Sequence, residues 1–171
     1  GSAASAVQFV PEIVPVAGQV HLFQRSANWV LPKLDRPYTA EQLDAFRTDP
    51  ARLLAFRAAV EADMNKGMTF ADPELNAARE ADGLAAIEVV RDPEVRAKLR
   101  PTHPFGCKRP LFSNTYYQAF NEPNLELVTD PITRLTAGGV VTADGVERTV
   151  DTVILATSFT TTRYTSAIEV G

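Results

Sequence analysis

The chain has 171 residues, of which 45% are hydrophobic and 22% charged, a composition typical of a folded domain and not of a disordered chain. Its 17 Lys and Arg against 21 Asp and Glu give a net charge of −4, so it lacks the basic character that nucleic-acid binding needs. No apolar run reaches the roughly 18 residues of a membrane span, and no secretory signal is recognisable. The single cysteine, Cys107, can form neither an internal disulfide nor a cysteine metal site. We therefore expect a cytoplasmic protein without metal, membrane or nucleic-acid partners.

Both ends of the sequence suggest a piece of a longer protein. The first residue is Gly1 rather than methionine, and no polar tail follows residues 168–171. The alternative is a trimmed but complete domain, with Gly1 and Ser2 left over from expression.

Residues 1–38 predict a helix, a strand and an extended connector. Apolar residues at helical spacing predict a helix over residues 1–14, bent at Pro11. The apolar run Val20–Phe23 predicts a short strand. Residues 28–38 contain two prolines and read as extended, and we expect Trp29 either to pack inside the protein or to line a cofactor cleft.

Residues 39–100 predict three or four helices and no strands. Thr39 and Gln42 have the spacing of a capping box, which marks a helix start. Three Asp-Pro pairs mark further helix starts with proline at the first helical position: Asp49-Pro50, Asp72-Pro73 and Asp92-Pro93.

From residue 101 the pattern changes to a loop, a short helix and several strands. We expect a proline-bounded loop over 103–114 and a short helix through Tyr116, Tyr117 and Phe120, capped by Ser113 or Asn114. Asp144-Gly145 is a strong hairpin signal. The apolar run over residues 152–156 predicts a strand buried on both faces of a parallel sheet. The other β-type runs are Leu125–Thr129, Ile132–Thr136, Val140–Thr142 and Arg148–Val150.

The first candidate site is the run of small residues at the start of the chain. Gly1, Ala3 and Ala6 have the spacing of the G-x-G-x-x-G/A motif, in which glycines let the backbone approach a pyrophosphate at a helix N-terminus. Ala3 takes the second glycine position, where its methyl group hinders that approach. Small residues are common near a terminus, so this signal alone is weak.

The second candidate site follows the strand Val20–Phe23. Dinucleotide folds usually place an acidic residue there to bind the ribose 2′-hydroxyl, whereas this chain has Arg25 followed by Ser26. A cation at this position pairs with the 2′-phosphate of NADP. Such a charge-assisted bond contributes about 1.5–3 kcal/mol, or roughly a tenfold to hundredfold preference for NADP over NAD. The alternative for Arg25 is a solvated charge at the end of a strand.

Two further segments carry residues suited to cofactor chemistry. Lys108 and Arg109 lie in a loop bounded by prolines, which restricts where these cations can lie. Fixed cations suit phosphate binding or a developing negative charge, although a surface basic pair is the alternative. Small and hydroxyl residues follow the predicted core strand, at the edge where α/β sheets bind ligands: Ala156, Thr157, Ser158 and Phe159.

Together these segments resemble the flavin-dependent Baeyer–Villiger monooxygenases, with the hydroxyacetophenone type nearest. The resemblance rests on Ala4–Trp29, Phe105–Tyr117 and Asn121–Phe159. Its motifs are specific in combination: Phe23–Ser26 with Lys108–Pro110 and Ala156–Phe159. The helical block over 39–100 is the least specific part.

The resemblance implies an α/β fold, namely a partial Rossmann-like dinucleotide-binding domain with a helical insertion and a C-terminal β-hairpin plus core strand from the FAD domain. The implied NADP-binding domain covers residues 1–38 and 101–136, and the helical insertion covers 39–100. Residues 137–171 form the implied return segment to the FAD-binding domain.

The resemblance also implies roles for single residues. Arg25, Ser26 and Lys108 contact the 2′-phosphate. Arg109 is catalytic: it lies by the flavin and stabilises the negatively charged peroxyflavin that attacks the substrate carbonyl. The remaining cofactor-binding residues lie in the glycine-motif segment and near the end of the chain: Gly1, Ala3, Ser5, Ala6, Gln8, Ala156, Thr157, Ser158 and Phe159.

These features predict part of an FAD- and NADPH-dependent monooxygenase that acts on a small organic carbonyl compound with O2, giving an ester or lactone, or that oxidises a heteroatom. The family's FAD-binding motif and its histidine–tryptophan fingerprint are absent, so the FAD site lies mostly outside this chain. Ser158 replaces a family glycine and Thr160 an acidic residue, and we expect the chain to be inactive alone. Alternatives are an N-hydroxylating flavoprotein monooxygenase and a non-catalytic NADP-binding module. His21 and His103 have no acid or nucleophile spaced to pair with them, so we expect both to be structural.

Overall fold

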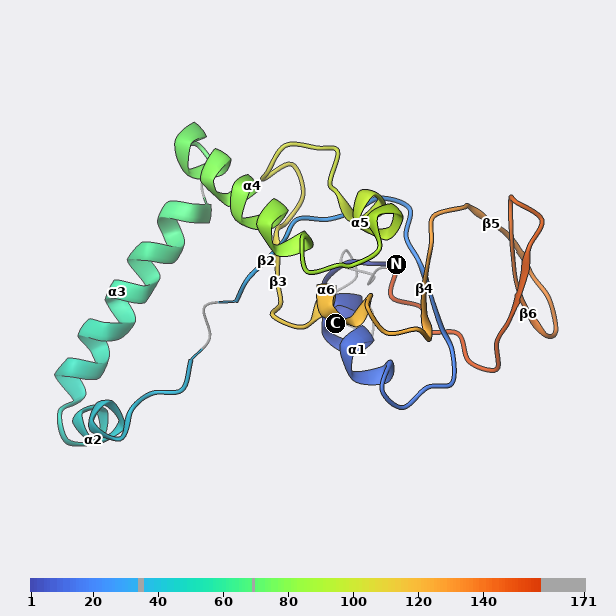
Figure 1. Ribbon diagram of the computed structural model, residues 1–171. Coiled ribbons are helices and arrows are strands. Elements are labelled where there is room, and N and C mark those ends of the chain that lie inside the picture. Colours follow the sequence, from blue (N-terminus) through green and yellow to red (C-terminus); the bar gives the residue numbers. More distant parts are fainter. Residues whose placement is uncertain (34–35, 69, 158–171) are drawn as a thin grey trace, which may run out of the picture.

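The computed structural model describes residues 1–33, 36–68 and 70–157 and shows a mixed α/β arrangement of small sheets and helices (Figure 1). Its central unit joins helix α1 (Ala4–Ile13) to strands β1 (Val20–Phe23) and β4 (Leu125–Val128). β1 and β4 are parallel, with Val20 opposite Leu125 and Phe23 opposite Val128. The predicted mixed α/β class and the predicted strand Val20–Phe23 are therefore confirmed.

Helix α1 confirms the helix predicted at the start of the chain. Its buried residues Ala6, Val7 and Val10 recur at helical spacing and face the core. Pro11 lies inside the last turn, where the cost of the missing N–H is limited to one backbone hydrogen bond. The core around this face also contains Leu22 of β1 and Leu127 of β4.

The described residues of 39–100 form four helices and no strand: α2 (Ala40–Thr48), α3 (Pro50–Met68), α4 (Pro73–Ile87) and α5 (Pro93–Leu99). The capping box is present, because Thr39 Oγ1 accepts from the Gln42 N–H at 3.2 Å and Gln42 Oε1 accepts from the Thr39 N–H at 2.9 Å. Asp72 and Asp92 accept hydrogen bonds from the first-turn amides of α4 and α5. The helix starts predicted from these signals are confirmed.

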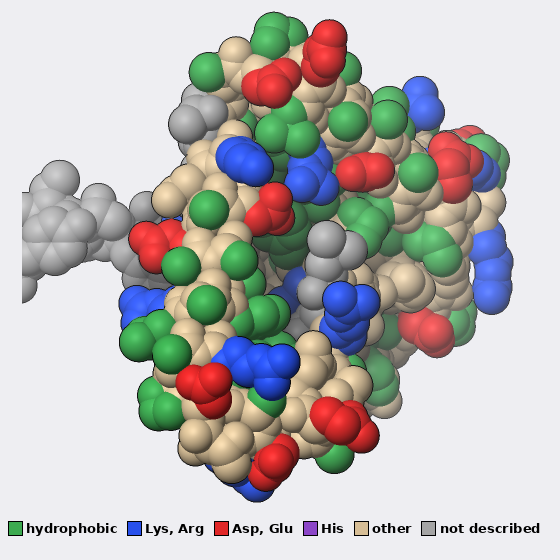
Figure 2. Space-filling view, turned by 90° about the vertical axis from the view of Figure 1, so that its left-hand side faces the viewer, with side chains coloured by type: hydrophobic (Ala, Val, Ile, Leu, Met, Phe, Trp, Pro, Cys, Tyr) green, Lys and Arg blue, Asp and Glu red, His purple; other side chains and the backbone are tan. Residues whose placement is uncertain are grey.

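These four helices differ in how they meet the rest of the molecule. α4 and α5 contribute Ile87 and Leu99 to the core, and α4 also places Gly83 against the Trp29 ring, where a Cβ atom would lie 2.8 Å from the indole. α2 and α3 extend away from the unit formed by α1, β1 and β4 (Figure 1), and α2 has no buried residue. Figure 2 looks onto this side and shows hydrophobic side chains exposed among charged ones.

One short strand pairing was not predicted. β2 (Val30–Leu31) pairs in parallel with β3 (Leu111–Phe112), within segments that the sequence indicates as an extended connector and a loop. Helix α6 (Tyr116–Ala119) follows β3, and Ser113 Oγ accepts from the Tyr116 N–H at 3.1 Å, as the predicted Ser113 cap requires.

The last described elements form a three-stranded antiparallel sheet: β5 (Ile132–Leu135), β6 (Gly139–Thr142) and β7 (Glu147–Thr149). The predicted turn at Asp144-Gly145 joins β6 to β7, and Gly145 adopts a φ of +82° that suits glycine. The Asp144 carboxylate accepts from the Val146 N–H at 3.0 Å and closes the turn.

The core strand predicted over residues 152–156 is wrong. These residues form no strand, and Leu155 is 79% exposed. An apolar run becomes a core strand only where neighbouring strands satisfy its backbone groups, and no described strand pairs with it. Among the described residues no helix combines the length and apolar character needed to cross a bilayer.

Candidate functional site

The loop after β1 and the start of α1 lie at the same edge of the β1–β4 pair (Figure 1). Asn28 Nδ2 in that loop donates a hydrogen bond to the Ser2 carbonyl oxygen at 3.2 Å. This contact joins the glycine-motif segment to the loop that carries Arg25 and Ser26. The edge is the carboxyl end of both parallel strands, which is where α/β sheets bind ligands.

Lys108 reaches the same loop from a distant part of the sequence. Its Nζ atom donates to Ser26 Oγ at 2.8 Å, across a separation of 82 residues. The loop that carries Lys108 is held by Trp29, whose Nε1 donates to the His103 carbonyl oxygen at 2.9 Å, and by Phe105, whose ring lies edge-on to Trp29. Trp29 is buried, so the packing role expected of it is the one the structure shows.

The two ends of the described chain also meet at this site. Gly1 lies so close to Ala156 that a Cβ atom on Gly1 would collide with the Ala156 carbonyl group and meet Thr157. The glycine-motif segment and the segment after the predicted core strand are thus side by side. Ser158, Phe159 and Thr160 lie outside the described residues.

The first turn of α1 leaves its backbone amides without a side-chain cap. Such amides, together with the positive end of the helix dipole, favour an anion. Ala3 and Gln8 are exposed, and Gln8 Nε2 donates back to the Ala4 carbonyl oxygen at 2.9 Å. Ser5 is half-buried, whereas Ala6 is completely buried in the core, where a small residue permits close helix–strand packing.

Arg25 and Arg109 are both exposed. Within the part of the chain that the structure describes, neither guanidinium forms a hydrogen bond or an ion pair. Arg25 and Lys108 supply positive charge at this edge, and Arg109 follows Lys108 in the same exposed loop.

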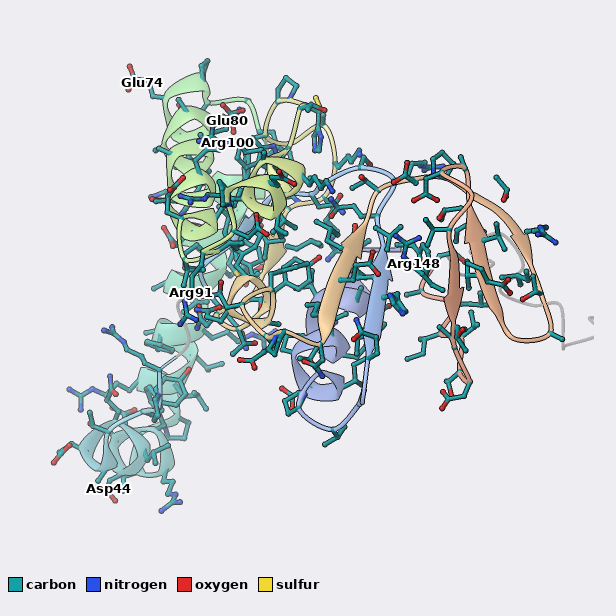
Figure 3. The ribbon with its side chains drawn as sticks, turned by 45° about the vertical axis from the view of Figure 1, so that its right-hand side comes forward. Asp44, Glu74, Glu80, Arg91, Arg100 and Arg148 are labelled. Atoms are coloured by element: carbon teal, nitrogen blue, oxygen red, sulfur yellow. The ribbon has the colours of Figure 1, made fainter. Side chains whose placement is uncertain are left out.

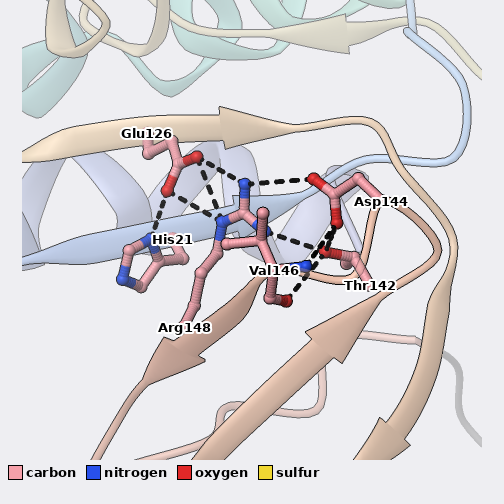
Figure 4. A network of polar contacts seen from close by, with 6 residues as sticks. All are labelled: His21, Glu126, Thr142, Asp144, Val146 and Arg148. Atoms are coloured by element: carbon pink, nitrogen blue, oxygen red, sulfur yellow. Dashed lines mark hydrogen bonds and ion pairs between the residues drawn. The ribbon is translucent and has the colours of Figure 1, made fainter.

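The expectation that no acid pairs with His21 is wrong. His21 Nδ1 lies 2.6 Å from Glu126 Oε2, because the parallel register places these two residues opposite each other (Figure 4). Glu126 also accepts from Arg148, whose Nη2 lies 2.7 Å from Glu126 Oε1, and this bond together with that of His21 lowers the pKa of the Glu126 carboxyl below its ordinary value. The pair is a structural contact between strands and involves none of the predicted site residues.

His103 contributes to the structure through its carbonyl group. Its side-chain Nε2 is buried without a hydrogen-bond partner among the described residues. Burial, with the positive charge of Lys108 adding to it, lowers the pKa of the His103 imidazole. Residues that could hold a metal ion in a group of three or more are absent from the described ranges.

Gln24 and Asn28 are site residues that the sequence reasoning missed. Gln24 Nε2 donates to the Lys98 carbonyl oxygen at 2.9 Å, and Asn28 makes the contact with Ser2. The only sequence signal for Gln24 and Asn28 is that their amide side chains lie on either side of Arg25 and Ser26 in the loop. Two hollows on the described surface lie elsewhere, around Asp72 at the start of α4 and around Phe46 between α2 and α3.

Comparisons with known proteins bear on this arrangement. No family model matches the sequence. Over 163 residues the chain is 36% identical to a Baeyer–Villiger monooxygenase of Pseudomonas aeruginosa, covering 94% of this chain and 31% of that protein. The structure matches a cyclohexanone monooxygenase variant of Rhodococcus sp. Phi1 bound to NADP+ with a TM-score of 0.76 and 28% identity, covering 95% of this chain and 39% of that chain. The chain is homologous to one segment of the Baeyer–Villiger monooxygenases.

A phenazine N-monooxygenase of Lysobacter antibioticus is also similar, with 30% identity over 201 residues, covering 94% of this chain and 37% of that protein. The chain thus spans about a third of the length of the curated relatives it matches. The resemblance to Baeyer–Villiger monooxygenases that the motifs indicated is confirmed. The roles of the individual site residues and the domain boundaries remain predictions.

Proposed function

We propose that this chain provides the NADP-binding part of an FAD- and NADPH-dependent monooxygenase of the Baeyer–Villiger type. The whole protein would convert a small ketone into an ester or lactone, or oxidise a heteroatom. The observation that carries the proposal is the contact of Lys108 Nζ with Ser26 Oγ at 2.8 Å, next to Arg25 and beside the start of α1. This arrangement gathers the groups that a 2′-phosphate needs.

The described residues suit both anionic groups of NADP, the 2′-phosphate and the pyrophosphate. Arg25 and Lys108 would pair with the 2′-phosphate, and the Ser26 hydroxyl would donate a hydrogen bond to it. The uncapped amides of α1 would face the pyrophosphate. The absence of a side chain at Gly1 lets its backbone lie against that of Ala156, because a Cβ atom on Gly1 would collide with the Ala156 carbonyl group. Ala3 takes a glycine position of the motif and is exposed. Its methyl group would hinder the approach of the pyrophosphate and weaken its binding.

The remaining site residues would act around the reacting end of the cofactor. When bound, NADPH supplies the hydride and FAD supplies the oxygen chemistry. Arg109, which is exposed and makes no polar contact with the described chain, would present a positive charge to the negative charge that develops during oxidation. Ala156 and Thr157 would line the cofactor edge beside Gly1. The family resemblance assigns cofactor contacts to Ser158 and Phe159 as well.

The proposed domain organisation follows from the same assignment. Residues 1–38 and 101–136 form the NADP-binding unit, 39–100 the helical insertion, and 137–171 the return segment towards the FAD-binding domain. The parallel pairing of β1 with β4 and of β2 with β3 supports the first two boundaries, because each pair joins 1–38 to 101–136 across the helices.

A direct test compares the affinities of the chain for NADPH and NADH by titration calorimetry. We expect a preference for NADPH of about tenfold to a hundredfold, and a loss of most of that preference in Arg25→Ala and Lys108→Ala. Arg57→Ala, which removes an exposed arginine on α3, is the matched control and should leave the preference unchanged. Equal affinities of the native chain for the two cofactors would contradict the proposal.

A second test concerns flavin. The chain lacks the family's FAD-binding motif, so we expect the 171 residues alone to retain no FAD and to show no monooxygenase turnover. Purification followed by an absorbance spectrum checks this, and a stably bound flavin would overturn the assignment of the FAD site to other segments. N-oxidation is a second candidate activity, favoured by the similarity to the phenazine N-monooxygenase. Product analysis with a ketone and an aromatic amine, on the whole protein, distinguishes the two.

A further inference from the structure

The loop that carries Arg25 and Ser26 is held at both ends by amide side chains. Gln24 is polar yet only 4% exposed, and it directly precedes Arg25. Its backbone N–H donates to the Val128 carbonyl oxygen at 2.8 Å, which extends the contact between β1 and β4 by one residue. Its side chain then reaches away from the strands to the carbonyl group of Lys98.

The contact with Lys98 links the loop to the helical segment. Lys98 lies in the last turn of α5, where backbone carbonyl groups have no partner within the helix. Gln24 supplies a donor to one of them at 2.9 Å. α5 is itself fixed to the core by the buried Leu99. The start of the loop therefore rests on a helix that is anchored in the core.

The other end of the loop is held by Asn28. Its Nδ2 atom donates to the carbonyl oxygen of Ser2, which is a buried residue just before α1. The neighbouring Ala27 is buried as well. Arg25 and Ser26 remain exposed between these two anchors, and Lys108 meets Ser26 from the opposite loop.

This construction favours binding of a phosphate for a physical reason. A loop that has to be ordered when its ligand binds loses part of the interaction free energy, whereas a loop already held in place does not. We propose that Gln24 and Asn28 are positioning residues, which fix the loop so that Arg25 and Ser26 meet the 2′-phosphate of NADP without further ordering. The inference rests on the proposed function, and it assigns the control of cofactor preference to two residues that are not charged.

The test measures cofactor preference in Gln24→Met and Asn28→Ala. Methionine keeps the length of the buried Gln24 side chain while removing its donor. We expect each variant to bind NADPH about three- to tenfold more weakly while its affinity for NADH changes little, because NADH carries only a hydroxyl where NADPH carries the phosphate that this loop would bind. Circular dichroism spectra establish that each variant is folded, and either variant alone suffices for the test.

The matched control is Asn124→Ala. Asn124 Nδ2 donates to the carbonyl oxygens of Val14 and Ala17 at 2.8 and 2.9 Å, so it makes the same kind of bond at the opposite end of α1. This variant should lose stability but keep the native ratio of NADPH to NADH affinity. A purely structural role for Gln24 and Asn28 would lower both affinities together and leave that ratio unchanged.

The outcomes separate this inference from the function on which it rests. If the native chain prefers NADPH and the two variants lose that preference, both stand. If the native chain prefers NADPH and the variants keep its ratio, or if Asn124→Ala lowers the ratio equally, the positioning role is overturned and the proposed function stands. If the native chain shows no preference, the proposed function fails first.

Discussion

The body around α1, β1 and β4 and the arm formed by α2 and α3 both follow their sequence signals, yet they bury their apolar residues very differently. In the body, Val10 and Ile87 are completely or almost completely buried. In the arm, Leu53, Leu54 and Met64 are exposed, and an aromatic cluster of Tyr38, Phe46 and Phe56 packs between α2 and α3, with ring centroids 5.3–5.8 Å apart.

The difference shows that local signals determine where a helix starts, whereas packing between elements determines how stable the fold is. Caps and prolines set the helix starts in both regions, because they satisfy backbone groups locally. Stability comes mainly from apolar surface packed against other elements, which the arm largely lacks. The candidate cofactor site depends on the body, since two of its contacts join segments that carry buried residues: Ser2–Asn28 and Ser26–Lys108.

The comparison predicts that a substitution in the core causes the largest loss of stability. We expect Ile87→Ala to lower the free energy of unfolding by about 2–5 kcal/mol, because it leaves a cavity at a site with 0% exposure. Leu54→Ala removes a side chain that is 63% exposed on α3 and should change it by less than about 0.5 kcal/mol. Urea unfolding followed by circular dichroism measures both. Similar losses in the two variants would mean that the arm is packed as firmly as the body.

The second largest effect tests how firmly the sheet of β5, β6 and β7 is joined to the body. Arg148 on β7 lies between this sheet and β4 (Figure 3), with its side chain 11% exposed. Its guanidinium donates to Glu126 of β4 and, through Nη1, to Thr142 of β6 at 2.8 Å. We expect Arg148→Gln to cost about 1–3 kcal/mol of unfolding free energy, because charge-assisted bonds at a largely buried group are lost.

The matched control for Arg148 is Arg96→Gln. Arg96 pairs with Glu88 at 2.5 Å, but both side chains are accessible to solvent, so its loss should cost at most about 1 kcal/mol. Urea unfolding of the two variants measures the difference. Equal costs would show that the Arg148 network contributes no more than a surface ion pair and that the sheet is only loosely joined to β4.

A smaller effect concerns the helix caps. Asp92→Ala removes the cap of α5, which is anchored in the core by Leu99, and should lower the global unfolding free energy by about 1 kcal/mol. Thr39→Ala removes the cap of α2, a helix without buried residues. The loss of stability should therefore appear as local fraying of α2. Hydrogen exchange at the α2 amides, compared with global urea unfolding, separates the two responses. A global loss of the same size in Thr39→Ala would contradict the separation of arm and body.

The helices and the turn between β6 and β7 could be predicted because their signals are local. The capping box at Thr39, the aspartates before proline and the turn at Asp144-Gly145 each act within a few residues, and the structure shows all of them. The strand expected over 152–156 failed because a core strand depends on its neighbours, which the apolar run itself does not reveal. The short β2–β3 pair was missed for the same reason, since its partners lie far apart in the sequence.

The site shows the same division. Arg25 and Lys108 could be named from residue type and loop position, and Ser26 from the family resemblance. The contact between Ser26 and Lys108 spans 82 residues and is a property of the fold. Gln24 and Asn28 are ordinary loop amides until the structure gives Lys98 and Ser2 as their acceptors. Parallel register likewise brings together His21 and Glu126, which the sequence did not pair.

The smallest expected effect is the pH dependence of the same network. The hydrogen bond from Arg148, with that from His21 adding to it, places the pKa of Glu126 below its ordinary value in the folded chain. The unfolded chain therefore binds more protons between the two pKa values, so stability increases with pH through that range and is lost as pH falls through the folded pKa. The carboxyl group is partly exposed and screened by water, which keeps this contribution below that of Arg148 itself.

Arg148→Gln isolates this contribution. Asp144 also has a lowered pKa, caused first by its hydrogen bonds to Thr142 and Val146, and these bonds remain in the variant. The unfolding free energy, measured by urea titration from neutral to acidic pH, should therefore fall less steeply below the ordinary pKa of glutamate in Arg148→Gln than in the native chain, while Arg96→Gln keeps the native slope. Parallel pH profiles for the native chain and Arg148→Gln would show that the bond from Arg148 does not lower the pKa of Glu126 in the folded chain, so that the charge of Glu126 would not help to join the sheet of β5, β6 and β7 to β4.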